Sequence, residues 1–288
     1  MRVGLNMLLW TTHVTDEHAP LLEKLKEAGC DGVEIPVMGG EASHFKGLSK
    51  ILNDSGLAST CSIVMPDEEH NPISADPAHR QGGLDYLKWA IDCAHALGSS
   101  LICGPFFQPL GVFSGGGPTE EEKERAVEVH REAADVAAQA GVALAVEALN
   151  RFECYFLNTL ADAAAHPRRV GRPNFGVLFD TFHANIEEKD PVGCIAKHVD
   201  VIKHVHTSEN DRGTPGKGHV DWLGTFRALR SGGYDGWLVI EAFGRAFPDL
   251  AEATRIWRDL FPTSAEVYEQ GVPFVRQQWE AAGQTTRA

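Results

Sequence analysis

The sequence has 288 residues, of which 43% are hydrophobic and 23% are charged, and its formal net charge is −14 at pH 7. This is the composition of a globular protein, and its apolar runs are much shorter than the ~20 residues of a membrane-spanning helix. The acidic balance and the lack of a Lys- and Arg-rich cluster argue against nucleic acid as a partner, because a phosphate backbone requires a basic surface. The six cysteines form no Cys-x-x-Cys pair, which predicts reduced thiols and a cytoplasmic protein.

Apolar segments of strand length alternate with helical segments along the whole chain. The pattern begins with a strand at 3–9 and a helix at 17–28, and it repeats without a linker or a change of composition. The expected strands span residues 3–9, 32–37, 57–64, 100–104, 142–147, 175–180, 201–207 and 237–242. The expected helices span residues 17–28, 41–55, 77–97, 119–140, 159–166, 191–198 and 221–230.

Eight strand-plus-helix units predict one α/β domain over residues 1–288, a single (β/α)8 or TIM barrel. A doubly wound open sheet is the alternative. It is disfavoured because no Gly-x-Gly-x-x-Gly follows the first strand and because the strand count closes at eight. A helical pattern at 264–281, which includes Phe274 and Trp279, predicts an extra C-terminal helix that covers the barrel or a neighbouring subunit.

Four residues with metal-binding side chains stand at the ends of four consecutive predicted strands. They are Glu147, Asp180, His206 and Glu241. Taken singly, an acid at a strand end often caps the next helix, and a lone histidine is often a core residue. Because the carboxyl ends of parallel strands meet at one end of a barrel, four in succession predict a shared cation. Three carboxylates and one imidazole suit Mn²⁺, Mg²⁺ or Co²⁺, with Zn²⁺ as a further candidate.

The loops at the same end of the predicted barrel carry further candidate binding residues. A sugar or hydroxy-ketone on the metal would need hydrogen-bonding groups there, and Glu153, His183 and Arg212 have suitable side chains. Each of the three has a simpler interpretation: Glu153 begins a turn, His183 makes a supporting contact, and Arg212 is a solvated charge on a loop. Aromatic residues follow the first and fourth strands, which predicts an apolar wall opposite the cation.

Three segments of the chain resemble the ketose 3-epimerases, typified by D-tagatose 3-epimerase and D-allulose (D-psicose) 3-epimerase, within the xylose isomerase-like barrels. The segments are 147–153 (EALNRFE), 180–183 (DTFH) and 206–222 (HTSENDRGTPGKGHVDW). The resemblance implies a metal-dependent enzyme that inverts C3 of free ketoses. Such enzymes interconvert D-fructose and D-allulose, D-tagatose and D-sorbose, or L-ribulose and L-xylulose.

Carried over residue by residue, the resemblance assigns roles to the candidates named above. It implies that Glu147, Asp180, His206 and Glu241 hold a divalent metal, with Mn²⁺ expected first and Co²⁺ or Mg²⁺ as alternatives. It implies that Glu147 and Glu241 exchange the C3 proton through an enediolate, and that Glu153, His183 and Arg212 bind the oxygens around C1 to C3. Members of this family are commonly dimers or tetramers, so a homodimer or homotetramer is expected.

The pocket for C4 to C6 of the sugar is less well defined by the resemblance. The candidates for an apolar wall are Trp10, Phe106, Phe107, Phe113 and Phe243. The alternative for each is a place in the core or in a subunit contact. Asn6 stands where relatives often carry an aromatic residue, and it therefore bears on substrate preference.

Other functions stay open at this point. An aldose–ketose or hydroxypyruvate isomerase, or an inosose dehydratase, would use the same scaffold and cation. A noncatalytic sugar-binding barrel and a metal-dependent DNA-repair nuclease are further alternatives. The negative charge and the small number of histidines at strand ends weigh against the nuclease, and the lack of a Gly-rich loop with a lysine favours an unphosphorylated sugar.

Overall fold

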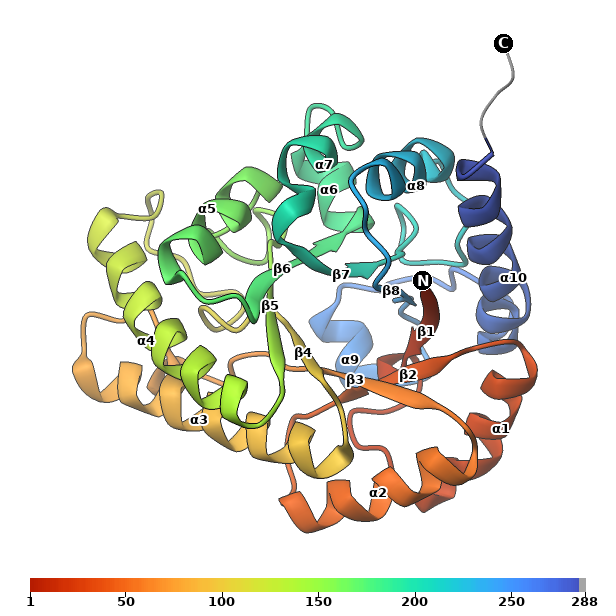
Figure 1. Ribbon diagram of the computed structural model, residues 1–288, viewed down its shortest axis with the longest axis horizontal. Helices are drawn as coiled ribbons and strands as arrows, with labels where there is room; N and C mark the ends of the chain where they lie inside the picture. Colours follow the sequence, from red (N-terminus) through yellow and green to blue (C-terminus); the bar gives the residue numbers. More distant parts are fainter. Residues whose placement is uncertain (285–288) are drawn as a thin grey trace.

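Eight parallel strands close into a barrel in the order β1 to β8 in the computed structural model, which describes residues 1–284 (Figure 1). This confirms the predicted (β/α)8 barrel. The last four residues of the domain predicted over 1–288 lie outside the described residues. The strands are β1 (Arg2–Asn6), β2 (Gly32–Pro36), β3 (Ala58–Ser62), β4 (Leu101–Gly104), β5 (Ala143–Glu147), β6 (Phe175–Asp180), β7 (Ile202–His206) and β8 (Trp237–Ile240).

The helices surround the barrel and follow the strands in turn (Figure 1). None of those in residues 1–284 is long and apolar enough to cross a membrane. They are α1 (Ala19–Glu27), α2 (Ala42–Asp54), α3 (Pro77–Leu97), α4 (Glu120–Gln139), α5 (Leu160–Val170), α6 (Thr181–Glu187), α7 (Gly193–His198), α8 (Trp222–Ser231), α9 (Pro248–Ala253) and α10 (Ser264–Ala282).

Local capping interactions explain where the predicted helices begin. Thr119 precedes α4, and its hydroxyl accepts a hydrogen bond from the Glu122 backbone while the Glu122 carboxylate accepts one from the Thr119 backbone. The Asp76 carboxylate caps α3, because it accepts a hydrogen bond from the Ala78 backbone, and Pro77 is the first residue of the helix. Such caps satisfy N–H groups that have no partner within the helix. Two short helices were not predicted, namely α6 and α9.

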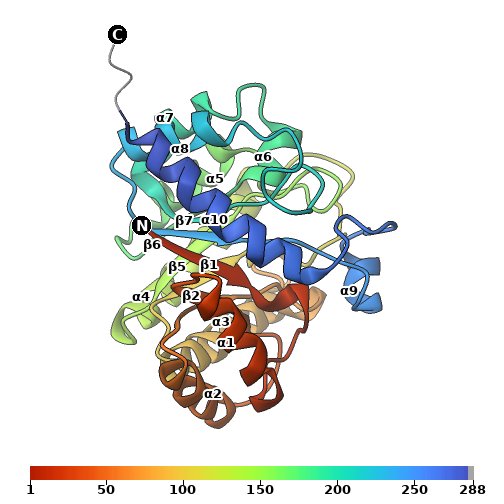
Figure 2. The ribbon, with the colours of Figure 1, turned by 90° about the vertical axis from the view of Figure 1, so that its right-hand side faces the viewer.

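The predicted C-terminal helix is confirmed as α10. It packs on α8, β1 and β8, and it therefore takes the place of the eighth outer helix of the barrel. Figure 2 shows it running across the molecule between α8 and α1. Its buried side chains, among them Val267, Val275 and Trp279, are spaced at helical intervals and join the main hydrophobic core.

The interior of the barrel is polar near its carboxyl end. Asn6, Glu34 and Thr60 are register neighbours on β1, β2 and β3, so they lie side by side on the barrel wall. All three are at most 1% exposed. Apolar residues usually fill the interior of a barrel of eight strands, so buried polar groups at this level need specific partners.

Candidate metal centre and substrate cavity

Four strand ends bring the predicted metal ligands together. Glu147, Asp180 and His206 are the last residues of β5, β6 and β7, and Glu241 follows β8 directly. Each offers one ligand atom, and these four atoms all lie within 4.8 Å of one another. These four residues are between 1% and 6% exposed. Parallel packing of the strands therefore creates a buried cluster from residues that are distant in sequence.

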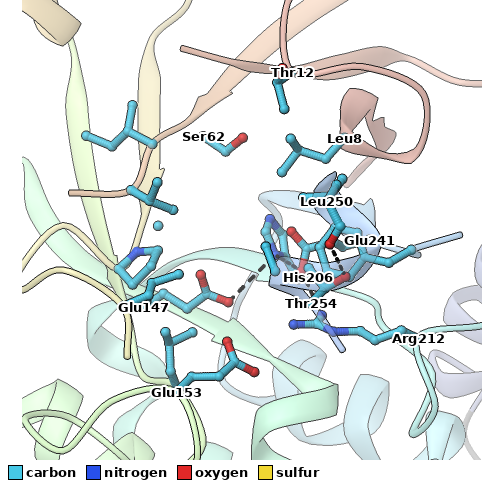
Figure 3. A pocket seen from close by; sticks show the side chains of 18 of the residues that line it. Leu8, Thr12, Ser62, Glu147, Glu153, His206, Arg212, Glu241, Leu250 and Thr254 are labelled. Carbon is cyan, nitrogen blue, oxygen red and sulfur yellow. Dashed lines mark hydrogen bonds and ion pairs between the residues drawn. The ribbon is translucent and has the colours of Figure 1, made fainter. Parts of the chain in front are cut away.

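The imidazole of His206 lies at the centre of this cluster. Its Nδ1 atom is 3.4 Å from Glu241 Oε2, 3.6 Å from Asp180 Oδ2 and 3.9 Å from Glu147 Oε1. Glu147 approaches it from one side of the cavity, and Glu241 approaches from the other (Figure 3). Among the described residues, His206 Nδ1 and Glu147 Oε1 are buried atoms without a hydrogen-bond partner. Two orphaned ligand atoms that face each other are what a cation between them would satisfy.

Burial and charge repulsion act strongly on the carboxylates. Burial raises the pKa of Glu147 well above its ordinary value, and the neighbouring Glu241 and Asp180 carboxylates raise it further. Burial alone would also raise the pKa of Asp180. The charge of the Arg212 guanidinium and the nearby His206 imidazole instead hold it well below its usual range. The cluster therefore contains two carboxyl groups with opposite tendencies to bind a proton.

Arg212 closes the cluster on one side. Its Nη1 donates to Asp180 Oδ2 at 2.8 Å and to Glu241 Oε2 at 2.7 Å. The guanidinium also stacks on Phe182 and Phe243, at 4.0 Å and 4.9 Å from the ring centroids. Burial would lower the pKa of Arg212, but the carboxylates around it raise that pKa instead. It is therefore a fixed positive charge within the centre.

The loop after β7 is arranged so that Arg212 points inward. Arg212 adopts a left-handed backbone conformation with φ of 66°. The fully buried Glu209 carboxylate holds this loop, because it accepts hydrogen bonds from the backbone N–H groups of Gly216 at 2.8 Å and Val220 at 3.1 Å. It also accepts one from Trp222 Nε1 at 3.1 Å. The strained residue thus depends on a supporting carboxylate elsewhere in the loop.

His183 and Glu153 line the same cavity. The backbone N–H of Asn150 donates to His183 Nδ1 at 3.0 Å, which places the proton of the neutral imidazole on Nε2. Burial and the nearby Arg212 lower the pKa of His183 to about 3, so the ring is neutral at pH 7. Its Nε2 lies 3.0 Å from Arg212 Nη2, and an oxygen acceptor could bind to both groups. Burial raises the pKa of Glu153, whose carboxylate accepts from Asn150 Nδ2 at 2.6 Å.

A cavity of about 400 Å³ lies over this centre (Figure 3). Its floor contains Glu147, Glu241, His206 and Arg212, whereas its walls are largely apolar. The apolar lining residues are Leu8, Met38, Ile63, Val64, Gly104, Pro105, Leu110, Leu149, Phe182, Phe243, Phe247, Leu250 and Ala253. A second cavity of about 720 Å³ adjoins it and shares Leu110, Glu153, Phe182 and Arg212. The exposed side chains of Phe152 and Trp257 line this outer cavity.

The structure brings Phe243 to the main cavity but not the other four aromatic candidates. Phe106 and Phe107 are fully buried, and they pack against His130 and Phe156 in the core. Gly104, two residues before Phe106, has a φ of 127°, and a Cβ there would lie 2.1 Å from Ile63 O. Trp10 donates from Nε1 to Ser264 Oγ at 3.1 Å, and Phe113 is 50% exposed; neither lines the cavity.

Two polar residues beside the cluster make contacts that were not predicted from the sequence. Glu34 lies in the middle of β2 and accepts hydrogen bonds from His204 and His206, both at 2.7 Å. Asn6 does not reach the cavity wall; its amide lies between Glu34 and Glu241. The available signal was an acidic residue within an apolar strand, Val33-Glu34-Ile35, but its partners lie on strands across the barrel.

Comparison with known proteins identifies the family of this chain. The family model "Xylose isomerase-like TIM barrel" matches residues 22–277. A ketose 3-epimerase of Arthrobacter globiformis is 32% identical over 284 residues, which cover 98% of each chain. A D-psicose 3-epimerase of Agrobacterium fabrum is 30% identical and covers 90% of this chain and 91% of its own.

Solved structures agree with the sequence comparison. A D-allulose 3-epimerase from Methylomonas sp., crystallised in complex with D-allulose, superimposes with a TM-score of 0.89 at 28% identity. The match covers 96% of this chain and 97% of that one. The chain therefore belongs to the xylose isomerase-like TIM barrel family and, within it, to the ketose 3-epimerases, which are isomerases.

Proposed function

We propose that this epimerase inverts C3 of unphosphorylated ketoses with the help of one divalent metal ion. D-fructose and D-allulose, D-tagatose and D-sorbose, and L-ribulose and L-xylulose are the substrate pairs to be compared. The observation that carries the proposal is the cluster of three carboxylates and one imidazole, of which Glu147, His206 and Glu241 line a single cavity, with Glu147 and Glu241 on different sides of it. An epimerase needs a proton acceptor on one face of C3 and a proton donor on the other.

Glu147, Asp180, His206 and Glu241 are the proposed metal ligands. The orphaned atoms His206 Nδ1 and Glu147 Oε1 support this set, since both are buried and face the same point. The oxygen-rich donors favour Mn²⁺, with Co²⁺ or Mg²⁺ as alternatives. When bound, a divalent ion supplies Lewis acidity that stabilises negative charge on a carbonyl oxygen.

Glu147 and Glu241 are the proposed acid and base at C3. Removal of the C3 proton next to the C2 carbonyl gives an enediolate, and return of a proton to the opposite face gives the epimer. Either residue takes or returns the proton, according to the direction of the reaction. Arg212 hydrogen-bonds Glu241 but not Glu147, so the two carboxylates differ in environment. That difference allows one to hold a proton while the other accepts one.

Glu153, His183 and Arg212 are the proposed partners of the oxygens around C1 to C3. His183 Nε2 and Arg212 Nη2 lie 3.0 Å apart and both residues line the cavity, so a substrate oxygen placed beside them would accept a hydrogen bond from each. The Glu153 carboxyl is suited to a hydroxyl group, because its raised pKa lets it accept or donate. These residues would hold the ketose in one orientation over the two glutamates.

The far end of the sugar is proposed to lie against the apolar wall. Phe243 and Leu8 line the cavity there, whereas Trp10, Phe106, Phe107 and Phe113 do not. Among the described residues that line this cavity, Arg212 is the one Lys or Arg side chain, and its Nη1 group already bonds Asp180 and Glu241. A cavity of this kind suits a neutral sugar better than a sugar phosphate.

We also propose a cytoplasmic homodimer or homotetramer. The large hydrophobic side chains that are exposed among the described residues, Leu110, Phe113, Phe152 and Trp257, all stand on loops at the carboxyl end of the barrel. Such residues are common in subunit contacts. All six cysteines are free and buried, which supports a reducing compartment. Light scattering after size-exclusion chromatography tests the oligomeric state.

NMR in deuterated water tests the reaction. The Mn²⁺-loaded protein is incubated with D-fructose, D-allulose, D-tagatose and L-ribulose in turn. Deuterium at C3 together with the C3 epimer supports the proposal and ranks the substrates. Deuterium at C1 alone would indicate an isomerase, loss of water from an inosose would indicate a dehydratase, and binding without exchange would indicate a noncatalytic sugar-binding protein.

A further inference from the structure

Glu34 is a buried carboxylate that has no place in the reaction described above. It lies in the middle of β2, next to the proposed ligand His206, and is 0% exposed. A carboxylate at this depth is costly unless each oxygen is well hydrogen-bonded.

Donors from four other strands surround Glu34. On Oε1 it accepts from Asn6 Nδ2 at 2.9 Å and from His206 Nε2 at 2.7 Å. On Oε2 it accepts from Thr60 Oγ1 at 2.9 Å, from His204 Nε2 at 2.7 Å and from Cys103 Sγ at 3.1 Å. Every neighbour therefore donates to this carboxylate, and together they fix its position.

These contacts are hydrogen bonds and do not form a second metal site. Glu34, Cys103, His204 and His206 have the residue types and proximity of a metal-binding group. However, two ligand atoms about 2.1 Å from one ion at a tetrahedral angle lie about 3.4 Å apart. The two imidazole nitrogens lie only 2.7 Å from the Glu34 oxygens, which is the length of a charge-assisted hydrogen bond.

The bond from His206 to Glu34 decides which nitrogen of His206 is free. A neutral imidazole carries one N–H, and the carboxylate at 2.7 Å requires that proton on Nε2. Nδ1 then presents its lone pair to the three carboxylates of the proposed metal centre. A ligating histidine whose other nitrogen bonds a carboxylate is held in one tautomer and one orientation.

Asn6 extends the same control to Glu241. Its two amide N–H groups reach Glu34 Oε1 at 2.9 Å and Glu241 Oε1 at 3.0 Å. Its Oδ1 accepts from the Leu8 backbone at 2.9 Å, which fixes the direction of the amide. The second oxygen of Glu241 is thereby turned toward His206 Nδ1, at 3.4 Å.

We propose that Glu34 is a positioning residue of the metal centre, which orients His206 directly and Glu241 by way of Asn6. The inference rests on the proposed metal centre. It assigns Glu34 no contact with metal or substrate. Losses of about 10- to 100-fold in metal affinity follow when such supporting contacts are removed.

Metal binding by Glu34→Gln tests the proposal. The amide keeps the shape of the side chain but turns an NH₂ group toward groups that donate to Glu34 in the wild type. Mn²⁺ affinity is measured by calorimetry, and the absorption spectrum of bound Co²⁺ reports the ligand geometry. Asp31→Asn is the matched control, since Asp31 immediately precedes β2 and pairs with Arg276 outside the site.

We expect Glu34→Gln to bind Mn²⁺ at least tenfold more weakly and to shift the Co²⁺ spectrum, while Asp31→Asn matches the wild type. Wild-type affinity and an unchanged spectrum in Glu34→Gln would overturn the inference without contradicting the proposed metal centre. Failure of the wild-type protein to bind either ion with a stoichiometry of one would instead overturn the metal centre itself.

A measurement on the wild type covers the case in which Glu34→Gln does not fold. Long-range ¹H–¹⁵N NMR of the Zn²⁺-loaded protein identifies the protonated nitrogen of His206. The proposal requires a proton on Nε2 and the metal-shifted signal on Nδ1. A metal-shifted Nε2 would refute it.

Discussion

Arg212 and Glu241 form a buried ion pair, in which Nη1 lies 2.7 Å from Oε2. The same nitrogen bonds Asp180, so one guanidinium serves two of the three carboxylates of the centre. Glu147 receives no hydrogen bond from Arg212, and burial raises its pKa. The fixed charge of Arg212 therefore makes the two proposed acid/base residues unequal before a substrate enters.

Replacing Arg212 by lysine should reduce kcat/KM strongly although the charge is kept. A lysine has no planar guanidinium to stack on Phe182 and Phe243. Its single ammonium group also cannot reproduce the contacts of the guanidinium with two carboxylates and His183. Loss of one or more hydrogen bonds to charged groups, at about 1.5 to 3 kcal/mol each, corresponds to about a 10- to 150-fold decrease. Arg168→Lys, in the exposed pair with Asp200, is the control and should keep wild-type kinetics.

Glu241→Gln should stop exchange of the C3 proton while the barrel stays folded. Removal of a general acid or base typically costs 10² to 10⁴ in rate. Deuterium uptake at C3 is followed at saturating Mn²⁺, so that a weakened metal site does not mimic the effect. Glu128→Gln, on the outer surface of α4, serves as the control. Wild-type exchange in Glu241→Gln would show that another group carries this proton.

The sequence allowed prediction of the barrel and of the group of four, because both depend on patterns along the chain. Strand ends of a parallel barrel share one face, so Glu147, Asp180 and His206 could be placed together without knowledge of contacts. Helix α6 was missed because it begins directly after the proposed ligand Asp180 and has only seven residues, too few for a periodic apolar pattern. Helix α9, with six residues, was missed for the same reason.

Contacts across the barrel could not be predicted in this way. Glu34 is 170 residues from His204, and local sequence contains no sign that their strands face each other. The aromatic wall shows a similar limit, since Phe106 follows the strand end but is fully buried in the core. Position along the chain predicts the level of a residue in the barrel, whereas the direction of its side chain depends on the loop.

Removal of the metal should lower the melting temperature, and Mn²⁺ should restore it. Three buried carboxylates share this centre with one arginine, so binding a cation relieves repulsion that the folded state otherwise carries. Mn²⁺ at about 100 times its dissociation constant should add about 2.7 kcal/mol to the free energy of unfolding. Calorimetric melts of chelator-treated protein with and without Mn²⁺ measure this gain. Asp180→Asn should abolish it, and an equal gain in that variant would indicate binding elsewhere.

Replacement of Asn6 by leucine should weaken the centre without filling the cavity. Leucine has a similar shape but cannot donate to Glu34 and Glu241, so both carboxylates lose a buried partner. We expect a lower kcat and weaker Mn²⁺ binding with little change in KM, because Asn6 does not line the cavity. An altered KM with unchanged metal affinity would instead assign Asn6 to the substrate.

A buried histidine pair should make the fold sensitive to acid. His130 Nε2 lies 3.1 Å from Phe106 O, so neutral His130 donates from Nε2 to this carbonyl. Its Nδ1 lies 2.6 Å from His166 Nε2 and accepts a hydrogen bond from it. Burial lowers the pKa of His130 to about 4, and burial together with His130 lowers the pKa of His166. The unfolded chain, with ordinary histidine pKa values, therefore binds more protons between pH 6.5 and 4, and stability falls as the pH falls through this range.

Urea unfolding at pH 7.5, 6 and 5 measures this loss. His130 alone should cost about 2 kcal/mol at pH 5 relative to neutral pH, since its pKa is about 6.5 in the unfolded chain. The double variant His130→Gln, His166→Gln should start less stable at pH 7.5 but lose less on acidification, because amides can hydrogen-bond and do not titrate. His95→Gln, on the exposed side of α3, should keep the wild-type pH dependence. If the free energy of unfolding of the double variant falls as steeply with pH as that of the wild type, protonation of other groups, such as the carboxylates of the metal centre, determines the acid stability.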